Sequence, residues 1–270
     1  MKHSHRSHTH HFVMRYPVAL HERLYVLFIA PLLTVIVIAA LVSFVPPSAS
    51  AGAVTLSLML GATLATLLRI GTAYVIAAVV AIPLALLVER NRTFEALLLP
   101  VFDVFESIPN LAIFPALLIF FLQFNFLDGA AITILFLNML WNIVFALVGG
   151  LQVIPKDVTY AARMFGLNGV SYVRRLVLPA VFPQFVTGSI LAVASGWNII
   201  IVAEAVHAYL PAGTNAQDLF GIGSLLVTTS AAGDKQSYIL AFIVMVGVIA
   251  LFNFFVWQKL LHYSQRFRFE

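Results

Sequence analysis

The sequence predicts an all-α integral membrane protein with six transmembrane helices. Of its 270 residues, 61% are hydrophobic and only 10% are charged, whereas an ordinary soluble domain has about 25% charged residues. Six apolar stretches each reach the length of about 20 residues that a helix needs to cross about 30 Å of hydrocarbon. This composition excludes a water-soluble fold.

The first predicted span, residues 24–46, contains no charged residue. Ser48-Ala49-Ser50-Ala51 behind it resembles a signal-peptidase site, but the apolar core is longer than the about 7–15 residues of a signal peptide. We therefore interpret this stretch as a retained anchor. The other predicted spans are 69–88, 94–124, 130–153, 176–206 and 238–261. Residues 55–68 either extend the second span outward or form an interfacial helix.

Lysine and arginine are distributed unequally between the two sides of these spans. With the N-terminus inside, 13 of the 15 basic residues lie in cytoplasmic segments, and only Arg69 and Lys235 do not. Positively charged short loops remain in the cytoplasm. The His-rich tail 1–23, the segment 155–179 and the C-terminal tail 262–270 are therefore predicted to be cytoplasmic. Arg69 is interpreted as a span-end residue that snorkels to the interface.

Residues 155–179 form a basic, amphipathic stretch between two apolar spans. Four of its apolar residues recur at helical spacing and so share one face of a short helix: Val158, Ala161, Ala162 and Phe165. Pro155 suits the first turn of this helix, and Gly166 suits a left-handed C-terminal cap. Asn168-Gly169 predicts a turn, with Ser171 capping a second short helix that ends or kinks at Pro179.

Missing motifs exclude some functions of this chain and limit others. The chain has no cysteine, so it forms neither disulfides nor thiolate metal sites. It has no G-x-x-x-x-G-K-[ST] phosphate loop, so an ATP-driven process would require a separate nucleotide-binding subunit. In the external loop 207–234, residues 221–224 are interpreted as a turn before a short amphipathic helix, rather than as a phosphate cradle.

The segment 155–179 also resembles a family signature. Tyr160-Ala161-Ala162, Gly166, Leu176 and Leu178-Pro179 reproduce the spacing of the E-A-A-x3-G-x9-I-x-L-P motif of the ABC importer permeases, the inner-membrane components of binding-protein-dependent transport systems. Tyr160 stands where the family usually has Glu. The stretches 69–71, 82–84, 108–115 and 202–204 are similar to landmarks of the nitrate, sulfonate and taurine branch. The resemblance covers about residues 55–260.

The resemblance implies a type I permease core at residues 55–261 that forms half of a translocation path for a small solute. The implied solute is an organic or inorganic anion such as nitrate, a sulfonate or a taurine-like compound. The implied partners are a dimeric ATP-binding cassette ATPase, a second permease subunit, either identical or related, and an extracytoplasmic solute-binding protein. The ATPase would bind the ATP, so no cofactor is expected on this chain.

The resemblance also assigns a role to the segment 155–179. Its helices would couple the membrane part to the ATPase through Tyr160, Ala161, Ala162, Arg163 and Gly166, because the small alanines let a helix seat closely in a groove. The absence of the usual Glu at Tyr160 puts a carboxylate contact to the ATPase in doubt. The alternative is an ordinary amphipathic loop on the inner leaflet.

Polar side chains inside the predicted spans are candidates for the path, because ionisable groups in hydrocarbon are costly unless they face a cavity or a partner. Asp103 and Glu106 share a helix face before a predicted break at Pro109 and Pro115. The full set of path candidates is Asp103, Glu106, Asn110, Asn142, Trp197, Asn198 and Glu204. The alternative is that they form structural hydrogen bonds within one subunit. Two ionised carboxylates would repel an anion, so this pair must be neutralised, paired or turned away from the path.

Two other function classes remain open at this point. An intramembrane enzyme could use Asp103 and Glu106 as acid and base on a lipid-soluble substrate, and an ion channel would act without an ATPase. Over these two classes we favour a transporter, and we expect that the protein is not an enzyme. Six of the eight histidines lie within the first 21 residues. Closely spaced histidines can bind Zn²⁺, but we interpret this stretch as a non-functional tail. We therefore predict no metal site.

Overall fold

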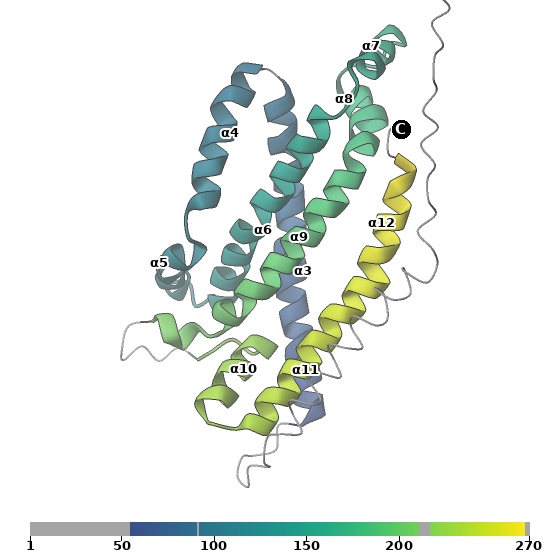
Figure 1. Ribbon diagram of the computed structural model, residues 1–270. Coiled ribbons are helices and arrows are strands. Elements are labelled where there is room, and N and C mark those ends of the chain that lie inside the picture. The colour runs from purple at the N-terminus through teal and green to yellow at the C-terminus, as the bar shows by residue number, and fades with distance from the viewer. Residues whose placement is uncertain (1–54, 91, 211–216, 268–270) are drawn as a thin grey trace, which may run out of the picture. The chain divides into compact units, whose positions relative to one another are not determined.

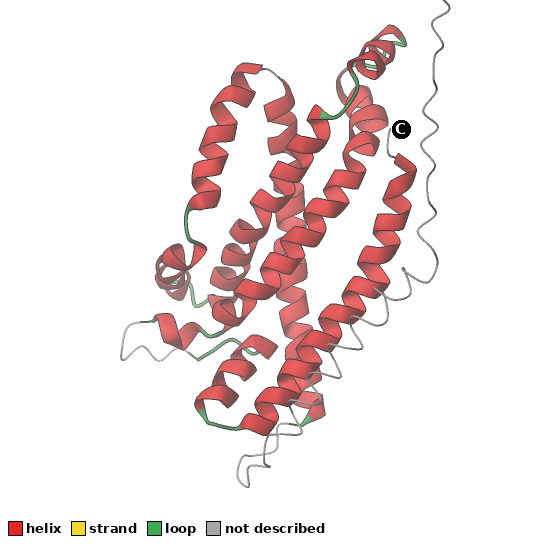
Figure 2. Ribbon diagram, in the orientation of Figure 1, coloured by secondary structure: helices red, strands yellow, loops and turns green. Residues whose placement is uncertain are grey.

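The computed structural model describes residues 55–90, 92–210 and 217–267. The predicted tail 1–23 and the first predicted span, 24–46, lie outside the described residues. Within the described residues every regular element is helical, as predicted (Figures 1 and 2). The α-helices are α3 (Leu56–Arg90), α4 (Arg92–Ser107), α5 (Asn110–Leu122), α6 (Leu127–Gln152), α7 (Lys156–Met164), α8 (Gly169–Tyr172), α9 (Leu178–Glu204), α10 (Ile222–Ala231), α11 (Lys235–Phe252) and α12 (Gln258–Ser264).

Four helical stretches in the described part are long and apolar enough to cross a membrane: Leu56–Val88, Leu127–Gln152, Gly169–Glu204 and Lys235–Phe267. The bent pair of α4 and α5 makes a fifth if it counts as one span. The second to sixth predicted spans therefore all have a counterpart. The last helical stretch continues to Phe267 through a π-turn at Asn253–Trp257, so it extends beyond the predicted end at residue 261.

The second span begins much earlier than predicted. Helix α3 runs without interruption from Leu56 to Arg90, so residues 55–68 are an extension of the span rather than an interfacial helix. The threonine hydroxyls in this region have hydrogen-bond partners inside the bundle: Thr63 Oγ1 donates to the Met59 carbonyl of its own helix at 2.7 Å, and Thr66 Oγ1 donates to Glu204 Oε1 at 2.7 Å. Arg69 consequently lies inside the helix, and the prediction of a snorkelling span-end residue is wrong.

The core of the described part is formed by α3, α6 and α9, which pack against one another (Figure 1). Helix α3 presents a stripe of fully buried alanines at four-residue spacing, Ala73, Ala77, Ala81 and Ala85. Helix α9 presents Gly188, Ala192 and Gly196 at the same spacing, and all three are buried. Small residues at this spacing let helix backbones approach closely inside a membrane.

The third predicted span is broken, as the prolines predicted. Helices α4 and α5 meet at an angle of 80°, and Pro109 lies at the break in an extended conformation as the N-cap of α5. Pro115, the second predicted break, lies inside α5 without ending it. It removes the hydrogen bond that its N–H would donate to the Leu111 carbonyl, but α5 continues to Leu122.

The predicted end of the short helix in 155–179 is confirmed. Pro155 is the N-cap of α7 rather than its first residue. Gly166 has a φ of +76°, and its N–H donates to the Arg163 carbonyl while the Leu167 N–H donates to the Ala162 carbonyl, both at 3.0 Å. These two bonds form a Schellman motif, which satisfies carbonyls at the helix end.

The second helix of this segment differs from the prediction. It begins at Gly169, which has a φ of +54°, and continues from α8 through a π-turn at Val173–Val177 into α9. Ser171 therefore does not cap it and Pro179 does not end it. The π-turn just before Pro179 accommodates a residue that has no N–H to donate. One continuous helix thus joins the segment 155–179, which is predicted to be cytoplasmic, to the membrane core.

The two ends of the described bundle carry different short helices. Figure 1 shows α7 and α8 at one end and α10 at the other. Helix α10 begins at Ile222 directly after Gly221, so a short helix is present as predicted, but it includes residues 222–224, which were predicted to form the turn before it. Asp234 then caps α11 by accepting from the Ser237 N–H at 3.2 Å.

Candidate functional site

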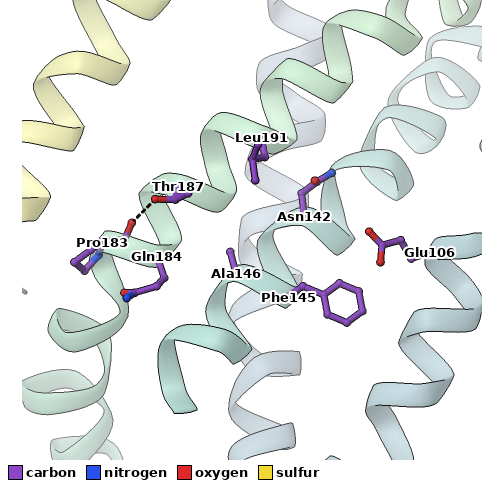
Figure 3. A pocket seen from close by; sticks show the side chains of 8 residues that line it. All are labelled: Glu106, Asn142, Phe145, Ala146, Pro183, Gln184, Thr187 and Leu191. Atoms are coloured by element: carbon purple, nitrogen blue, oxygen red, sulfur yellow. Dashed lines mark hydrogen bonds between the residues drawn. The ribbon is translucent and has the colours of Figure 1, made fainter. Parts of the chain in front are cut away.

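A cavity of about 520 Å³ lies between α4, α6 and α9 (Figure 3). Helix α4 contributes one side chain, Glu106, which points toward α6 in Figure 3. Among the described residues that line the cavity, Glu106 is the only charged one, and none is basic. The full lining is Glu106, Asn142, Phe145, Ala146, Pro183, Gln184, Thr187 and Leu191.

The polar groups of this cavity are held in defined orientations. Asn142 Nδ2 donates to the Asn138 carbonyl at 3.0 Å and to Ser195 Oγ at 3.2 Å. The Thr187 hydroxyl donates to the Pro183 carbonyl at 3.1 Å. Gln184 Oε1 is buried without a hydrogen-bond partner, which is uncommon because most buried polar atoms are paired.

A second cavity of about 240 Å³ shares Pro183 and Gln184 with the first. It is lined further by residues from the ends of α6 and α9 that lie nearer to α7, and by Phe267. The two cavities therefore lie in succession along α9. Gln184 is the polar side chain that both of them contact.

The structure brings together only two of the seven predicted path residues, Glu106 and Asn142. Asp103 is exposed on α4 and does not line the cavity, although it is close to Glu106 in the sequence. Side chains three residues apart are separated by about 60° around a helix axis, so the two carboxylates lie on the same broad face of α4, but only Glu106 reaches the cavity.

Three further predicted residues lie outside this cavity. Asn110 Nδ2 donates to Asn138 Oδ1 at 3.0 Å, which joins α5 to α6. Trp197 is buried in the core of the bundle. Asn198 is exposed, and its Nδ2 donates to the Ala194 carbonyl of its own helix at 3.3 Å.

The seventh predicted residue, Glu204, belongs to a buried ion pair. Arg69 Nη1 on α3 lies 2.9 Å from Glu204 Oε1 at the end of α9. The Glu204 side chain is 0% exposed and that of Arg69 is 11% exposed. Arg69 also donates from Nε to Asp128 Oδ1 at 2.6 Å and from Nη1 to the Phe220 carbonyl at 2.9 Å. One arginine thus joins α3, α6, α9 and the segment before α10.

The Glu204 carboxylate also holds the beginning of α10. Its Oε2 accepts from the Gly223 N–H at 2.8 Å, and its Oε1 accepts from Thr66 Oγ1 at 2.7 Å. Thr66 Oγ1 in turn accepts from the Ile222 N–H at 3.0 Å. Two backbone N–H groups that have no partner within the helix are thereby satisfied, and a negative charge at this helix end is favourable.

Sequence reasoning did not find this ion pair. It singled out Arg69 and Glu204 separately, the first as an interfacial residue and the second as a path candidate. The signal that could have found the pair is chemical: a basic and an acidic residue, each within an apolar stretch, are costly in hydrocarbon unless they meet.

Helix α7 exposes most of its apolar side chains. Of the predicted apolar face, only Ala162 is buried and Val158 is half-buried, whereas Ala161 and Phe165 are exposed. Met164 and Phe165 are 88% and 87% exposed. We call the exposed set Tyr160, Met164, Phe165 and Val170 the coupling patch, after the role that the sequence predicts for this segment. Arg163 and Gly166, the other two residues predicted to couple, are exposed beside it.

The sequence profile of the family described as "Binding-protein-dependent transport system inner membrane component" matches residues 77–268. The bicarbonate transport system permease protein CmpB of Synechococcus elongatus is 30% identical over 199 residues, which are 73% of this chain and 67% of that protein. The nitrate import permease protein NrtB of Leptolyngbya laminosa is 31% identical over 187 residues, 69% of this chain and 62% of that protein.

The taurine transport system permease protein TauC of Escherichia coli is 24% identical over 188 residues, 69% of this chain and 66% of that protein. The family and these relatives are transport permeases and not enzymes. The apolar helices of the described part fit a multi-pass membrane protein. Since the family profile extends from the middle of α3 to the end of the chain's last helix, the chain belongs to the binding-protein-dependent transport system inner membrane components, the type I permeases of ABC importers, and resembles their nitrate, sulfonate and taurine branch.

Proposed function

We propose that this chain is the transmembrane permease subunit of an ATP-driven importer and that residues 155–179 couple it to a separate ATPase. The coupling patch is the observation that carries this proposal. Phe165 and Met164 contact almost nothing in their own chain, and exposed apolar groups on a helix at the end of a bundle favour docking to a protein partner. The exposed Ala161 lets that partner approach the helix closely.

The distribution of charge supports a cytoplasmic position for this end of the bundle. Lys156, Arg163, Arg174 and Arg175 gather in and just after α7, and positively charged short segments are retained in the cytoplasm. We place the N- and C-termini on the same side. The short helix α10 at the opposite end of the bundle then faces the exterior.

The proposed assembly contains two permease subunits, either two copies of this chain or this chain with a related one. An ATP-binding cassette ATPase dimer would bind the ATP, and an extracytoplasmic solute-binding protein would deliver the solute. The relatives are named for bicarbonate, nitrate and taurine. We therefore propose a small organic or inorganic anion as the solute.

The continuous helix from α8 to α9 supplies a mechanical link between the ATPase and the path. It begins at Gly169, directly after α7, and carries Pro183 and Gln184 of the cavity. When ATP closes the ATPase dimer, displacement of α7 would tilt this helix and turn the paired cores from inward-open to outward-open. Hydrolysis would reset them.

The two alternative functions receive less support. An intramembrane enzyme would need Asp103 and Glu106 to face one site, but only Glu106 lines the cavity. An ion channel would act alone and would have no use for an exposed coupling patch. An experiment can distinguish a channel from the proposed importer, since a channel would conduct ions in the absence of any ATPase.

Replacing Gly166 by Val is expected to abolish solute-stimulated ATP hydrolysis while the membrane part still assembles. Gly166 has a φ of +76°, and holding a bulky residue in that conformation costs about 1–3 kcal/mol. Nothing lies within 4 Å of a Cβ built there, so the strain is confined to the end of α7. The measurement is the ATPase rate of the complex with and without loaded solute-binding protein.

Gly233→Val is the matched control for this strain. Gly233 has a φ of +69°, and its Cβ position is equally open, but it lies between α10 and α11 at the opposite end of the bundle. This variant should keep the stimulation. Equal losses in the two variants would argue against a coupling role for α7.

Replacing Phe165 by Ser is expected to weaken co-purification of the ATPase about tenfold or more, the effect of removing an aromatic anchor from a protein interface. The side chain is 87% exposed, so the thermal unfolding temperature of the isolated permease should hardly change. Phe124→Ser, at an exposed phenylalanine between α5 and α6, serves as the control. Retention of the ATPase at wild-type affinity by the Phe165 variant would contradict the docking proposal.

A further inference from the structure

We infer that the cavity between α4, α6 and α9 is a solute subsite that binds a positively charged amino group, so that the solute carries an ammonium in addition to any anionic group. This inference rests on the proposed function, because it treats the cavity as part of the path of an importer. It narrows the solute from a small anion to an amino acid-like zwitterion.

The first support is the charge of the cavity. Glu106 is the only charged side chain among the described residues that line it. No basic lining residue is present to offset the carboxylate or to receive an anion. Glu106 is exposed, and two charges near a protein surface still interact more strongly than two charges in bulk water. A simple anion is therefore repelled here, whereas an ammonium group is attracted.

The second support is that the neutral polar groups offer acceptors. Asn142 Nδ2 is occupied by two bonds within the protein, so the amide oxygen is what this residue offers to the cavity. The Thr187 proton is donated to the Pro183 carbonyl, which leaves the hydroxyl oxygen as an acceptor. Against these acceptors the lining offers one side-chain donor group, the Gln184 amide nitrogen.

The third support is the buried Gln184 Oε1, which has no hydrogen-bond partner. An unpaired buried acceptor is destabilising, because it has lost its bonds to water without gaining others. A solute that donates a hydrogen bond would remove this deficit. An ammonium has three donors and no acceptor, so it matches a site that presents a carboxylate and several neutral oxygens.

The size of the site agrees with a small solute. A volume of about 520 Å³ lies within the range of about 300–1,000 Å³ that is typical of small-molecule pockets. Within it, the ammonium would contact Glu106, and the anionic group of the same molecule would point away from the carboxylate. A solute with an anionic group can then bind in an acidic cavity, because the same molecule also carries a positively charged ammonium.

The test uses three probes that share a two-carbon skeleton: taurine with an ammonium and a sulfonate, ethanesulfonate with the sulfonate alone, and ethylamine with the ammonium alone. Displacement of radiolabelled taurine is measured on the complete permease and ATPase complex in lipid nanodiscs, without the solute-binding protein. We expect ethylamine to compete at least about tenfold more strongly than ethanesulfonate, because only ethylamine pairs with the carboxylate.

Substitutions in the cavity test which side chains bind the ammonium group. Glu106→Gln removes the charge at constant shape and should weaken taurine binding about tenfold or more. Glu95→Gln is the matched control on the same helix; Glu95 accepts from Gln152 Nε2 at 2.8 Å, outside the cavity, and its variant should bind taurine as the wild type does. Gln184→Met keeps the volume but removes the unpaired acceptor, and should weaken taurine while leaving ethanesulfonate unchanged.

Three results would overturn the inference: ethanesulfonate competing as well as ethylamine, a correctly assembled Glu106→Gln complex that binds taurine as tightly as the wild type, or no binding of taurine at all. Assembly is checked by size-exclusion chromatography. These failures are distinct from a failure of the proposed function. An ATPase that co-purifies and responds to Gly166→Val but not to Gly233→Val would leave the importer proposal standing without the ammonium subsite.

Discussion

Replacing Glu204 by Leu is expected to destabilise the permease by about 3–5 kcal/mol, the cost of removing one partner of a buried ion pair. The Arg69 guanidinium, 11% exposed, would lose its buried counter-charge, and the Gly223 N–H at the start of α10 would lose its acceptor. We expect a large decrease in the thermal unfolding temperature of the detergent-purified protein, and a weakened attachment of α10 to α9.

A double-variant cycle separates the ion pair from ordinary packing. In Arg69→Leu with Glu204→Leu both charges are absent, so the double variant should be more stable than the sum of the two single losses predicts. Asp128→Asn is the control, since its carboxylate is 46% exposed and contributes little when solvent screens it. Additive losses in the cycle would show that the two charges do not stabilise each other.

Replacing Gly188 by Ala is expected to destabilise the α6 and α9 interface by about 1–3 kcal/mol, the usual cost of overpacking. A Cβ at this position would lie 2.5 Å from Ala146 Cβ and 3.0 Å from the Asn142 backbone carbonyl. Neither neighbour can move without displacing α6. Because Ala146 and Asn142 both line the cavity that we propose as part of the path, the variant should also reduce transport.

A compensating change makes this prediction specific. Gly188→Ala combined with Ala146→Gly removes the methyl group that would clash and should recover part of the stability. Gly149→Ala, at an exposed position with nothing within 4 Å of the added Cβ, should be neutral or slightly stabilising, since alanine favours a helix by about 1 kcal/mol over glycine. Stability is measured by thermal unfolding in one detergent. A Gly188→Ala protein as stable as Gly149→Ala would contradict the close approach.

Local features of this protein were predicted well. The apolar stretches correspond to helices because span length and composition are properties of consecutive residues. The break at Pro109 and the left-handed Gly166 depend equally on the residues at those positions. Predictions at segment ends were less accurate: Ser171 and Pro179 suggested a boundary that the π-turn at Val173–Val177 removes.

The candidate site was predicted only in part. Glu106 and Asn142 could be named as polar residues within apolar spans, but their common cavity depends on how α4 and α6 are rotated about their axes. Gln184 attracted no attention in the sequence, since glutamines commonly form structural bonds between helices. Its unpaired oxygen becomes visible only when the neighbours of the side chain are known.

The sequence alone determined that this is a helical membrane protein with a short amphipathic helix, α7, capped by Gly166, because composition, periodicity and turn residues act over short stretches of chain. Only the tertiary structure decided that Arg69 pairs with Glu204, 135 positions away, and that Glu106 shares a cavity with Gln184. The physical reason is that apolar helices can pack with many rotations and registers, and the choice among them comes from the close approach of small residues and from pairing the few buried charges.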